Sequence, residues 1–484
     1  MIRGIFWKLM ERFGVQGVQF VLQLYLARLL NPEHYGTLSL MIVFTNLASV
    51  FVQIGFSTAL IQNKDVTDED YSSVFWASLS IAAIMYGIIY FGAPAVGAFY
   101  AMPEIVQPLR ALALILFPGA LNSIQLAKVS REMDFKKMFY SNVGGIMVAG
   151  IAGITIAYFG GGLWALVVQS LLNVTVAAIV MLFTANWHPR FVFNPKRVIV
   201  LFRFGWKLLA SSLLENLYNN LSSLVIGKKY DAGTLGYYNR GAQFPQFIIN
   251  AISGAIQSVM LPALSADQDD TAKVKTTMRT SMTMSAFIIF PMMAGLAAVA
   301  TPLVTLLLTE KWLPSVPYMQ VFCFSLAFIP VHSCNVQAIN AMGRSDIFLK
   351  LEIIKKSYGI ALLVIAVTCF DSPMAIAMTG LLSTLISWFV NAFPNKKLIG
   401  YSYKEQLQDI LPVLFVSLVM YGGVRLVGGW CEAAQLADPV ILIVQIVTGV
   451  AFYLLLSWML KLQSFTVILG LCGKVLKKER NEGL

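Results

Sequence analysis

The chain has 484 residues, of which 58% are hydrophobic and 12% charged, and its 35 basic and 24 acidic side chains give a net charge of +11. Soluble proteins carry about twice that share of charged residues, so a soluble class is excluded and a polytopic membrane protein is indicated. Three histidines and five cysteines, none in a metal-ligand spacing, predict no metal site and no disulfide framework. The triplet Gly160–Gly162 lacks the Lys-Ser/Thr of a phosphate-binding loop, and no cofactor is expected.

Apolar runs separated by polar turns predict about fourteen helical spans, because a helix needs about 20 residues to cross a bilayer. The first six spans are expected near 5–30, 37–62, 73–97, 107–127, 139–159 and 163–184. After a polar break at 185–200, six more are expected near 204–227, 234–261, 280–301, 316–342, 348–370 and 373–393. A final pair is expected near 408–428 and 438–461.

The basic residues predict the orientation of these spans. Of the 35 lysines and arginines, 28 fall on the side that holds both termini. Cytoplasmic segments retain such residues, so both termini are expected in the cytoplasm. The positive charge then follows from topology, and nucleic-acid binding is not expected. No signal-peptide cleavage site follows the first span. The basic tail, 462–484, fits either an amphipathic helix on the anionic leaflet or a retention-type positive tail.

The two halves of the chain show an internal repeat. Residues 12–14 and 203–205 both read Arg-Phe-Gly before a span, and 31–36 and 231–236 are short polar turns that end in glycine beside a tyrosine. The repeat predicts an all-α fold of two pseudo-symmetric six-helix lobes plus two C-terminal helices. The expected parts are an N-terminal six-helix lobe, a cytoplasmic inter-lobe linker, a C-terminal six-helix lobe, two additional helices and a basic tail, at 1–184, 185–200, 201–393, 394–461 and 462–484.

Polar stripes run along the first two spans of each half. Polar side chains inside a span point to a protein-lined or water-filled cavity, although a single amide more often holds neighbouring helices together. Because four stripes recur at repeat-related positions, we interpret them as a substrate cavity. Its candidate residues are Arg12, Gln16, Gln19 and Gln23, then Asn46, Ser49, Gln53 and Ser57, then Glu215, Asn216, Asn219 and Asn220, and finally Arg240, Gln243, Gln246, Asn250, Ser253 and Gln257.

The charges within these stripes favour an anionic glycolipid as cargo. Glu215 is the only carboxylate expected well inside a span, whereas Arg12 and Arg240 belong to the polar faces. Amides suit sugar hydroxyls, and guanidinium groups suit a pyrophosphate through bidentate hydrogen bonds. Glu215 is left as either an ion-pair partner or a proton carrier. Arg28 is expected to extend to the outer interface rather than to join the cavity.

Two further polar groups are expected to be structural. The acidic cluster Asp65, Asp68, Glu69 and Asp70 falls in a cytoplasmic loop, where a solvated surface is expected. His332, Asn335 and Asn340, in the tenth span, are expected mainly to pack against neighbouring helices.

These features resemble the polysaccharide-transport branch, the Wzx-type exporters, of the multidrug, oligosaccharidyl-lipid and polysaccharide flippase superfamily. The resemblance extends over essentially the whole chain and is most specific at 28–36 and 215–240. It implies a V-shaped pair of lobes in the bacterial inner membrane that moves a polyprenyl-pyrophosphate-linked oligosaccharide by alternating access, for exopolysaccharide biosynthesis of the colanic acid type. Membrane lipids and other polysaccharide-assembly proteins are the implied partners.

Three other functions compete with this expectation. A cation-coupled multidrug exporter of the same superfamily is disfavoured by the scarcity of carboxylates in the stripes. A membrane glycosyltransferase or polymerase is disfavoured because the expected outer loops, about 10 to 15 residues long, leave little surface for two substrates. A flippase for the lipid-linked peptidoglycan precursor is set aside on family resemblance alone.

Overall fold

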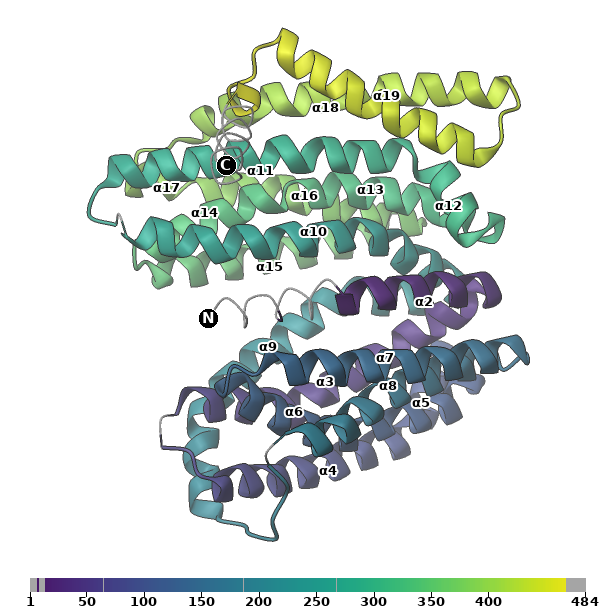
Figure 1. The fold of residues 1–484 in the computed structure, drawn as a ribbon, viewed down its shortest axis with the longest axis vertical. Helices are drawn as coiled ribbons and strands as arrows, with labels where there is room; N and C mark the ends of the chain where they lie inside the picture. The colour runs from purple at the N-terminus through teal and green to yellow at the C-terminus, as the bar shows by residue number, and fades with distance from the viewer. Residues whose placement is uncertain (1–6, 8–13, 64, 186, 267, 467–484) are drawn as a thin grey trace, which may run out of the picture. The chain divides into compact units, whose positions relative to one another are not determined.

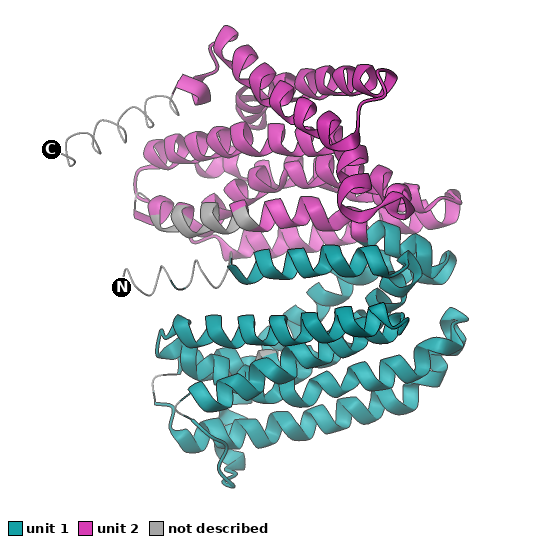
Figure 2. Cartoon of the chain, turned by 45° about the vertical axis from the view of Figure 1, so that its right-hand side comes forward, with its two compact units in different colours: residues 1–239 teal, residues 240–484 magenta. Residues whose placement is uncertain are grey.

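The computed structural model describes residues 7, 14–63, 65–185, 187–266 and 268–466, which fold into helices without strands (Figure 1). The chain forms two compact units, residues 1–239 and 240–484, coloured separately in Figure 2. The boundary falls inside one helix, α10 (Ala232–Ala266). The division into six-helix lobes on either side of 185–200 stays a proposal, and α9 begins within that break.

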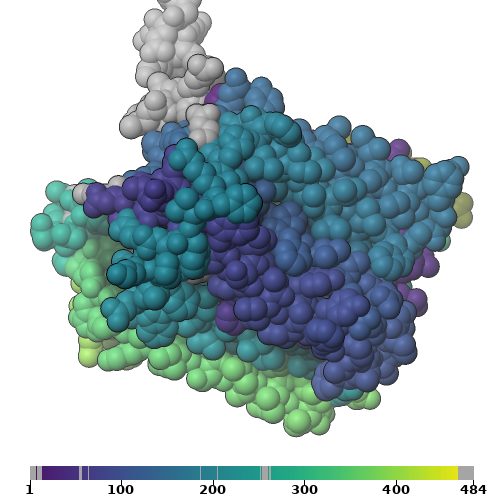
Figure 3. Space-filling view, turned by 90° about the horizontal axis from the view of Figure 1, so that it is seen from below, coloured from purple at the N-terminus to yellow at the C-terminus, as the bar shows by residue number. Residues whose placement is uncertain are grey.

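The first unit contains the helices up to the start of α10. They are α2 (Val15–Leu29), α3 (Pro32–Gln62), α4 (Asp68–Tyr100), η2 (Pro103–Ile105), α5 (Val106–Leu112), η3 (Ala113–Ile115), α6 (Leu116–Arg131), α7 (Phe135–Tyr158), α8 (Leu163–Thr184) and α9 (Pro195–Lys229). Within this unit α7 packs along α8, and α3 packs along α9 and α6. In the space-filling view of Figure 3, the segments of this unit are coloured from purple through blue to teal.

The second unit contains the rest of α10 and the helices that follow it. They are α11 (Thr271–Ala298), α12 (Ala300–Leu308), η4 (Glu310–Ser315), α13 (Val316–Ala327), α14 (Ile329–Ala341), α15 (Ser345–Cys369), α16 (Pro373–Ala392), α17 (Asn395–Leu398), α18 (Tyr403–Ala433) and α19 (Asp438–Met459). Here α18 packs against both α11 and α19, and α15 packs against α16.

Each of the fourteen expected spans coincides with a helix or a run of consecutive helices in the described residues, and the first span does so over the described residues of α2. Residues 8–13 of that span lie outside the described residues. Ten of these helical segments are long and apolar enough to cross a membrane. The other four expected spans are α2, α9, α10 and α15. Of these, α9 and α10 carry two of the polar stripes, and α15 carries five charged side chains in its first half. The predicted all-α polytopic membrane fold is confirmed.

Large apolar side chains cover much of the outer surface of the helices. Phe91 of α4 is 82% exposed, Phe183 of α8 86% and Leu426 of α18 69%. Soluble proteins rarely expose so many large apolar side chains, whereas a lipid bilayer solvates them. These helices therefore have faces suited to contact with lipid.

Candidate functional site

The glutamines predicted on the first span line part of a small cavity. Gln19 and Gln23 of α2 lie opposite α7 and α8, in a cavity of about 70 Å³ whose remaining polar walls are Gln169, Ser170 and Asn173 of α8. Gln16 is half-buried one turn earlier. Arg12 lies outside the described residues. The α2 stripe therefore brings amides together with further polar groups of its own unit.

The second stripe divides between two environments along α3. Asn46 is exposed. Gln53 is half-buried and packs against Gly119 of α6. The contact is close, since a Cβ added to Gly119 would lie 3.0 Å from the Nε2 of Gln53. Of these two candidates, Asn46 is thus the more accessible to a substrate.

On α9, the third stripe alternates between accessible and internally bonded side chains. Glu215 and Asn219 are exposed. The side-chain amide of Asn216 donates to the Ser212 carbonyl, and that of Asn220 to the Asn216 carbonyl, each over 2.8 Å. No side chain in the described ranges forms an ion pair with Glu215. An amide bonded to its own helix still offers its oxygen as an acceptor, so this face can bind hydroxyl groups.

On α10, the fourth stripe begins with a buried arginine. Arg240 is only 5% exposed, its guanidinium carbon lies 5.1 Å from the centroid of the Trp312 ring of η4, and it donates a hydrogen bond to Gln243. A cation over an indole at this distance is electrostatically favourable. The structure therefore holds Arg240 firmly in place within its unit.

Further along α10 the stripe becomes accessible. Gln246 donates from Nε2 to the Oδ1 of Asn250 over 2.7 Å, and both residues are exposed. Gln257 lies within α10, but its side chain lies outside what the structure describes.

Some polar residues of the spans were not singled out in the sequence. Gln169, Ser170 and Asn173 lie within the expected span 163–184, and their i, i+1, i+4 spacing marks one helix face. Glu352 of α15 lies within the expected span 348–370 and pairs with Lys355. Glu352 lies close to the start of that span, so the expectation that Glu215 alone lies well inside a span stays a prediction.

At the N-terminal end of α4, part of the acidic cluster is buried and paired. Asp70 is 3% exposed, and both of its carboxylate oxygens accept from Arg197, Oδ1 from Nε over 2.8 Å and Oδ2 from a terminal nitrogen over 2.7 Å. This carboxylate holds the pKa of Arg197 above its usual value through hydrogen bonding and charge. Asp68 pairs with Lys128 over 2.9 Å. The expected solvated surface was wrong for Asp70.

The segment before α9 is attached to the same end of α4. The Trp76 indole donates to the carbonyl of Arg190 over 2.8 Å, and the backbone N–H of Asn194 donates to the Ser73 hydroxyl over 2.9 Å. The ring of Trp76 also stacks on Phe191, 5.1 Å between centroids. Ion pair, hydrogen bonds and stacking together hold the 190–197 segment on α4.

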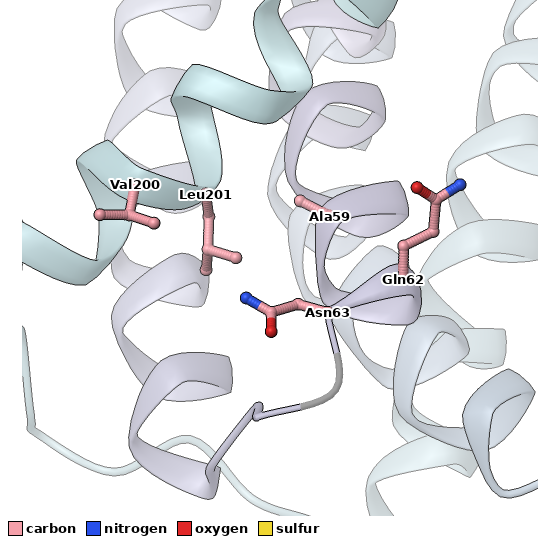
Figure 4. A pocket seen from close by; sticks show the side chains of 5 residues that line it. All are labelled: Ala59, Gln62, Asn63, Val200 and Leu201. Carbon is pink, nitrogen blue, oxygen red and sulfur yellow. The ribbon is translucent and has the colours of Figure 1, made fainter.

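Beside this attachment lies a second cavity, of about 270 Å³, lined by Ala59, Gln62, Asn63, Val200 and Leu201. Figure 4 shows Asn63, which follows α3, and Leu201 of α9 pointing toward the same space. Its described lining carries no charged group, and the carbon atoms of α3 and α9 dominate it. It therefore offers little to bind a charged headgroup.

Asn335 belongs to a fully buried amide cluster in the second unit. Its side chain exchanges two hydrogen bonds of 3.0 Å with Gln406 and accepts a third, of 2.7 Å, from Asn395. The cluster joins α14 and α17 to α18, and the packing role expected for Asn335 is confirmed. Among the described residues, no group of three or more His, Cys, Asp or Glu side chains could hold a metal ion.

Together these features define a polytopic helical membrane protein with amides and arginines within its spans and an uncharged polar cavity inside its first unit. Solved structures share this fold. The chain aligns with the lipid II flippase MurJ in an inward closed conformation, with a TM-score of 0.75, 15% identity and coverage of 94% of this chain and 98% of that one. It also aligns with an inward-facing multidrug resistance MATE family transporter, with a TM-score of 0.61, 16% identity and coverage of 78% and 95%.

Sequence relatives are named for polysaccharide biosynthesis. The chain is 25% identical to the succinoglycan biosynthesis transport protein ExoT of Rhizobium meliloti, over 85% of this chain and 81% of that one. It is 25% identical to the lipopolysaccharide biosynthesis protein WzxC of Escherichia coli, over 86% and 85%. Residues 25–317 match the family described as polysaccharide biosynthesis protein. The chain belongs to this family.

Proposed function

We propose that this protein is a flippase that moves a polyprenyl-pyrophosphate-linked oligosaccharide across the bacterial inner membrane for exopolysaccharide biosynthesis. The observation that carries the proposal is the cavity lined by amides and a hydroxyl between α2, α7 and α8, in a chain of the polysaccharide biosynthesis family. Such groups are costly in lipid and have no partner there, so a polar substrate accounts for their presence.

The physical task of a flippase explains the polar stripes. Carrying even one charged side chain to the bilayer centre costs about 2.5 to 3.5 kcal/mol on insertion scales, and an oligosaccharide pyrophosphate carries several polar groups. Amide side chains replace water around sugar hydroxyls, and the polyprenyl tail stays in lipid. Alternating access then exposes the headgroup to one side at a time.

The charges of the stripes support an anionic headgroup. Arg12 and Arg240 supply cations, and Glu215 is the single carboxylate among the proposed binding residues. A multidrug exporter for organic cations would need more carboxylates within its cavity. The proposed binding set is Arg12, Gln16, Gln19, Gln23, Asn46, Gln53, Glu215, Asn216, Asn219, Asn220, Arg240, Gln243, Asn250 and Gln257.

We also propose the orientation of the protein in the membrane and the residue ranges of its two lobes. Both termini lie in the cytoplasm of a bacterial cell, the lobes comprise 1–184 and 201–393, and the helices of 394–461 are additions to them. The 28 of 35 basic residues on one side of the expected spans support this orientation.

The test uses the full-length protein purified into liposomes with a polyprenyl-pyrophosphate oligosaccharide. Relocation is followed as loss of accessibility to an impermeant reagent on the starting leaflet, and the mass of the lipid is measured afterward. We expect relocation above protein-free liposomes with no change in mass. Transfer or release of sugar would instead support an enzyme, and relocation of organic cations alone would support a drug exporter.

A further inference from the structure

The cavity between α2, α7 and α8 is small and has two kinds of wall. Its volume is about 70 Å³. The polar wall consists of Gln19 and Gln23 from α2 and Gln169, Ser170 and Asn173 from α8, and α7 adds an apolar wall that includes Ala149. Among the residues that the structure describes, no charged side chain lines it.

Close packing against α7 positions the two amides of α8. A Cβ on Gly145 would lie 2.6 Å from the backbone carbonyl of Asn173 and 3.0 Å from its side-chain oxygen, and one on Gly153 would lie 3.1 Å from the Cβ of Gln169. Glycines at these positions let α7 and α8 approach closely, as small residues do between membrane helices. The amides are therefore held by backbone contacts rather than by a flexible loop.

The available hydrogen-bonding groups are all neutral. The Ser170 hydroxyl donates to the carbonyl of Leu166 over 2.8 Å, which leaves its oxygen as an acceptor. Each glutamine and asparagine carries two donors and one acceptor oxygen. In the described lining, a pyrophosphate would find no cation and a metal ion would find no carboxylate.

The chemistry of the two walls indicates what can enter. A hydroxymethyl arm matches both walls, because its carbon can lie against α7 while its hydroxyl bonds to the amides.

We infer that this cavity is a subsite for the hydroxymethyl arm of one sugar of the transported headgroup, and that Gln169 and Asn173 are specificity-determining residues. The inference rests on the proposed flippase function and deepens it. It adds α8 to the helices that recognise the substrate.

The test compares two probes in liposomes, a polyprenyl-pyrophosphate hexose and its 6-deoxy counterpart, which lacks only the hydroxyl of the arm. The wild-type protein should relocate the hexose about two- to tenfold faster, the ratio that one neutral hydrogen bond supplies. Gln169→Leu and Asn173→Leu should bring the ratio close to one while relocation of the 6-deoxy probe continues.

A further substitution alters the apolar wall of the cavity, which α7 forms. Ala149→Val adds volume without removing a polar group and should also lower the ratio, which keeps the test informative where an α8 variant folds poorly. Val148→Ile, on the exposed side of α7, is the matched control and should leave the ratio unchanged.

The outcomes separate this inference from the proposed function. Relocation of both probes with the same ratio in wild type and variants would overturn the subsite and leave the flippase standing. If the variants changed how the relocation rate depends on sodium or potassium, and did so equally for both probes, the cavity would be an ion site and the subsite would be overturned. Relocation of neither probe, nor of the full lipid-linked oligosaccharide, by the wild-type protein would overturn both.

Discussion

Gly36 and Gly236 lie against each other at the starts of α3 and α10, in a reciprocal arrangement. A Cβ on Gly36 would overlap the carbonyl oxygen of Ala232, and a Cβ on Gly236 would overlap that of Pro32. The residues that precede the two helices are also related, because Asn31 occupies the N-cap of α3 and Asp231 accepts the N–H of Thr234 over 2.8 Å. The repeat seen in the sequence is therefore a local two-fold contact.

This contact predicts that neither glycine tolerates a side chain. Gly36→Ala and Gly236→Ala should each lower the stability of the protein by about 1 to 3 kcal/mol, the usual cost of overpacking, because the opposing atoms are backbone and cannot rotate away. Thermal unfolding of the purified protein in detergent measures the effect. Gly87→Ala in α4, where no atom lies within 4 Å, is the control. Equal stability of Gly36→Ala and Gly87→Ala would contradict the contact.

Arg240 is predicted to affect both folding and transport. Arg240→Ala removes the cation from Trp312 and the donor from Gln243, so the melting temperature should fall. If the guanidinium also meets the pyrophosphate, export per membrane-inserted molecule should be abolished. Arg240→Lys keeps the charge without the planar fork and should be partly impaired.

Export normalised to the inserted protein separates these two roles of Arg240. Ile248→Leu on the same helix should be silent, and Asn250→Ala should have a smaller effect, since a neutral hydrogen bond contributes about 0.5 to 1.5 kcal/mol. Normal export per molecule in Arg240→Ala would remove this residue from the binding set.

The pair of Asp70 and Arg197 should stabilise the first unit. Asp70→Asn leaves Arg197 without its bidentate carboxylate, and the melting temperature should fall by several degrees, equivalent to about 1 to 3 kcal/mol, because the Asp70 side is buried. Lys196→Ala removes an exposed charge next to Arg197 and should have little effect. A difference of less than about 0.5 kcal/mol between the two variants would show that the pair is weak.

The orientation is open to a direct labelling test. In a background without native cysteines, single cysteines at 134 and 194 should react with an impermeant thiol reagent only after the cells are opened, whereas cysteines at 311 and 432 should react in intact cells. Labelling of position 134 from outside would reverse the predicted topology. The measurement needs no transport assay and tests orientation alone.

The sequence by itself determined the class of fold and the positions of the helices. Apolar runs of sufficient length form helices in a membrane whatever their neighbours are, because the backbone must satisfy its hydrogen bonds internally. For that reason each expected span, including the polar α9 and α10, coincides with helical structure. The Arg-Phe-Gly and polar-turn repeats also located Gly36 and Gly236 correctly as related helix starts.

Tertiary structure decided which polar groups meet. Gln19 and Gln23 share a cavity with Gln169 and Asn173, nearly 150 residues away in the chain, and no periodicity within α2 specifies that neighbour. Asp70 is buried and paired with Arg197, 127 residues later in the chain, although its neighbours in the sequence are acidic. The helical period shows which residues share a face of one helix. Which helix packs against that face depends on the sizes of the side chains on both helices, as the glycines of α7 show by letting α8 approach closely.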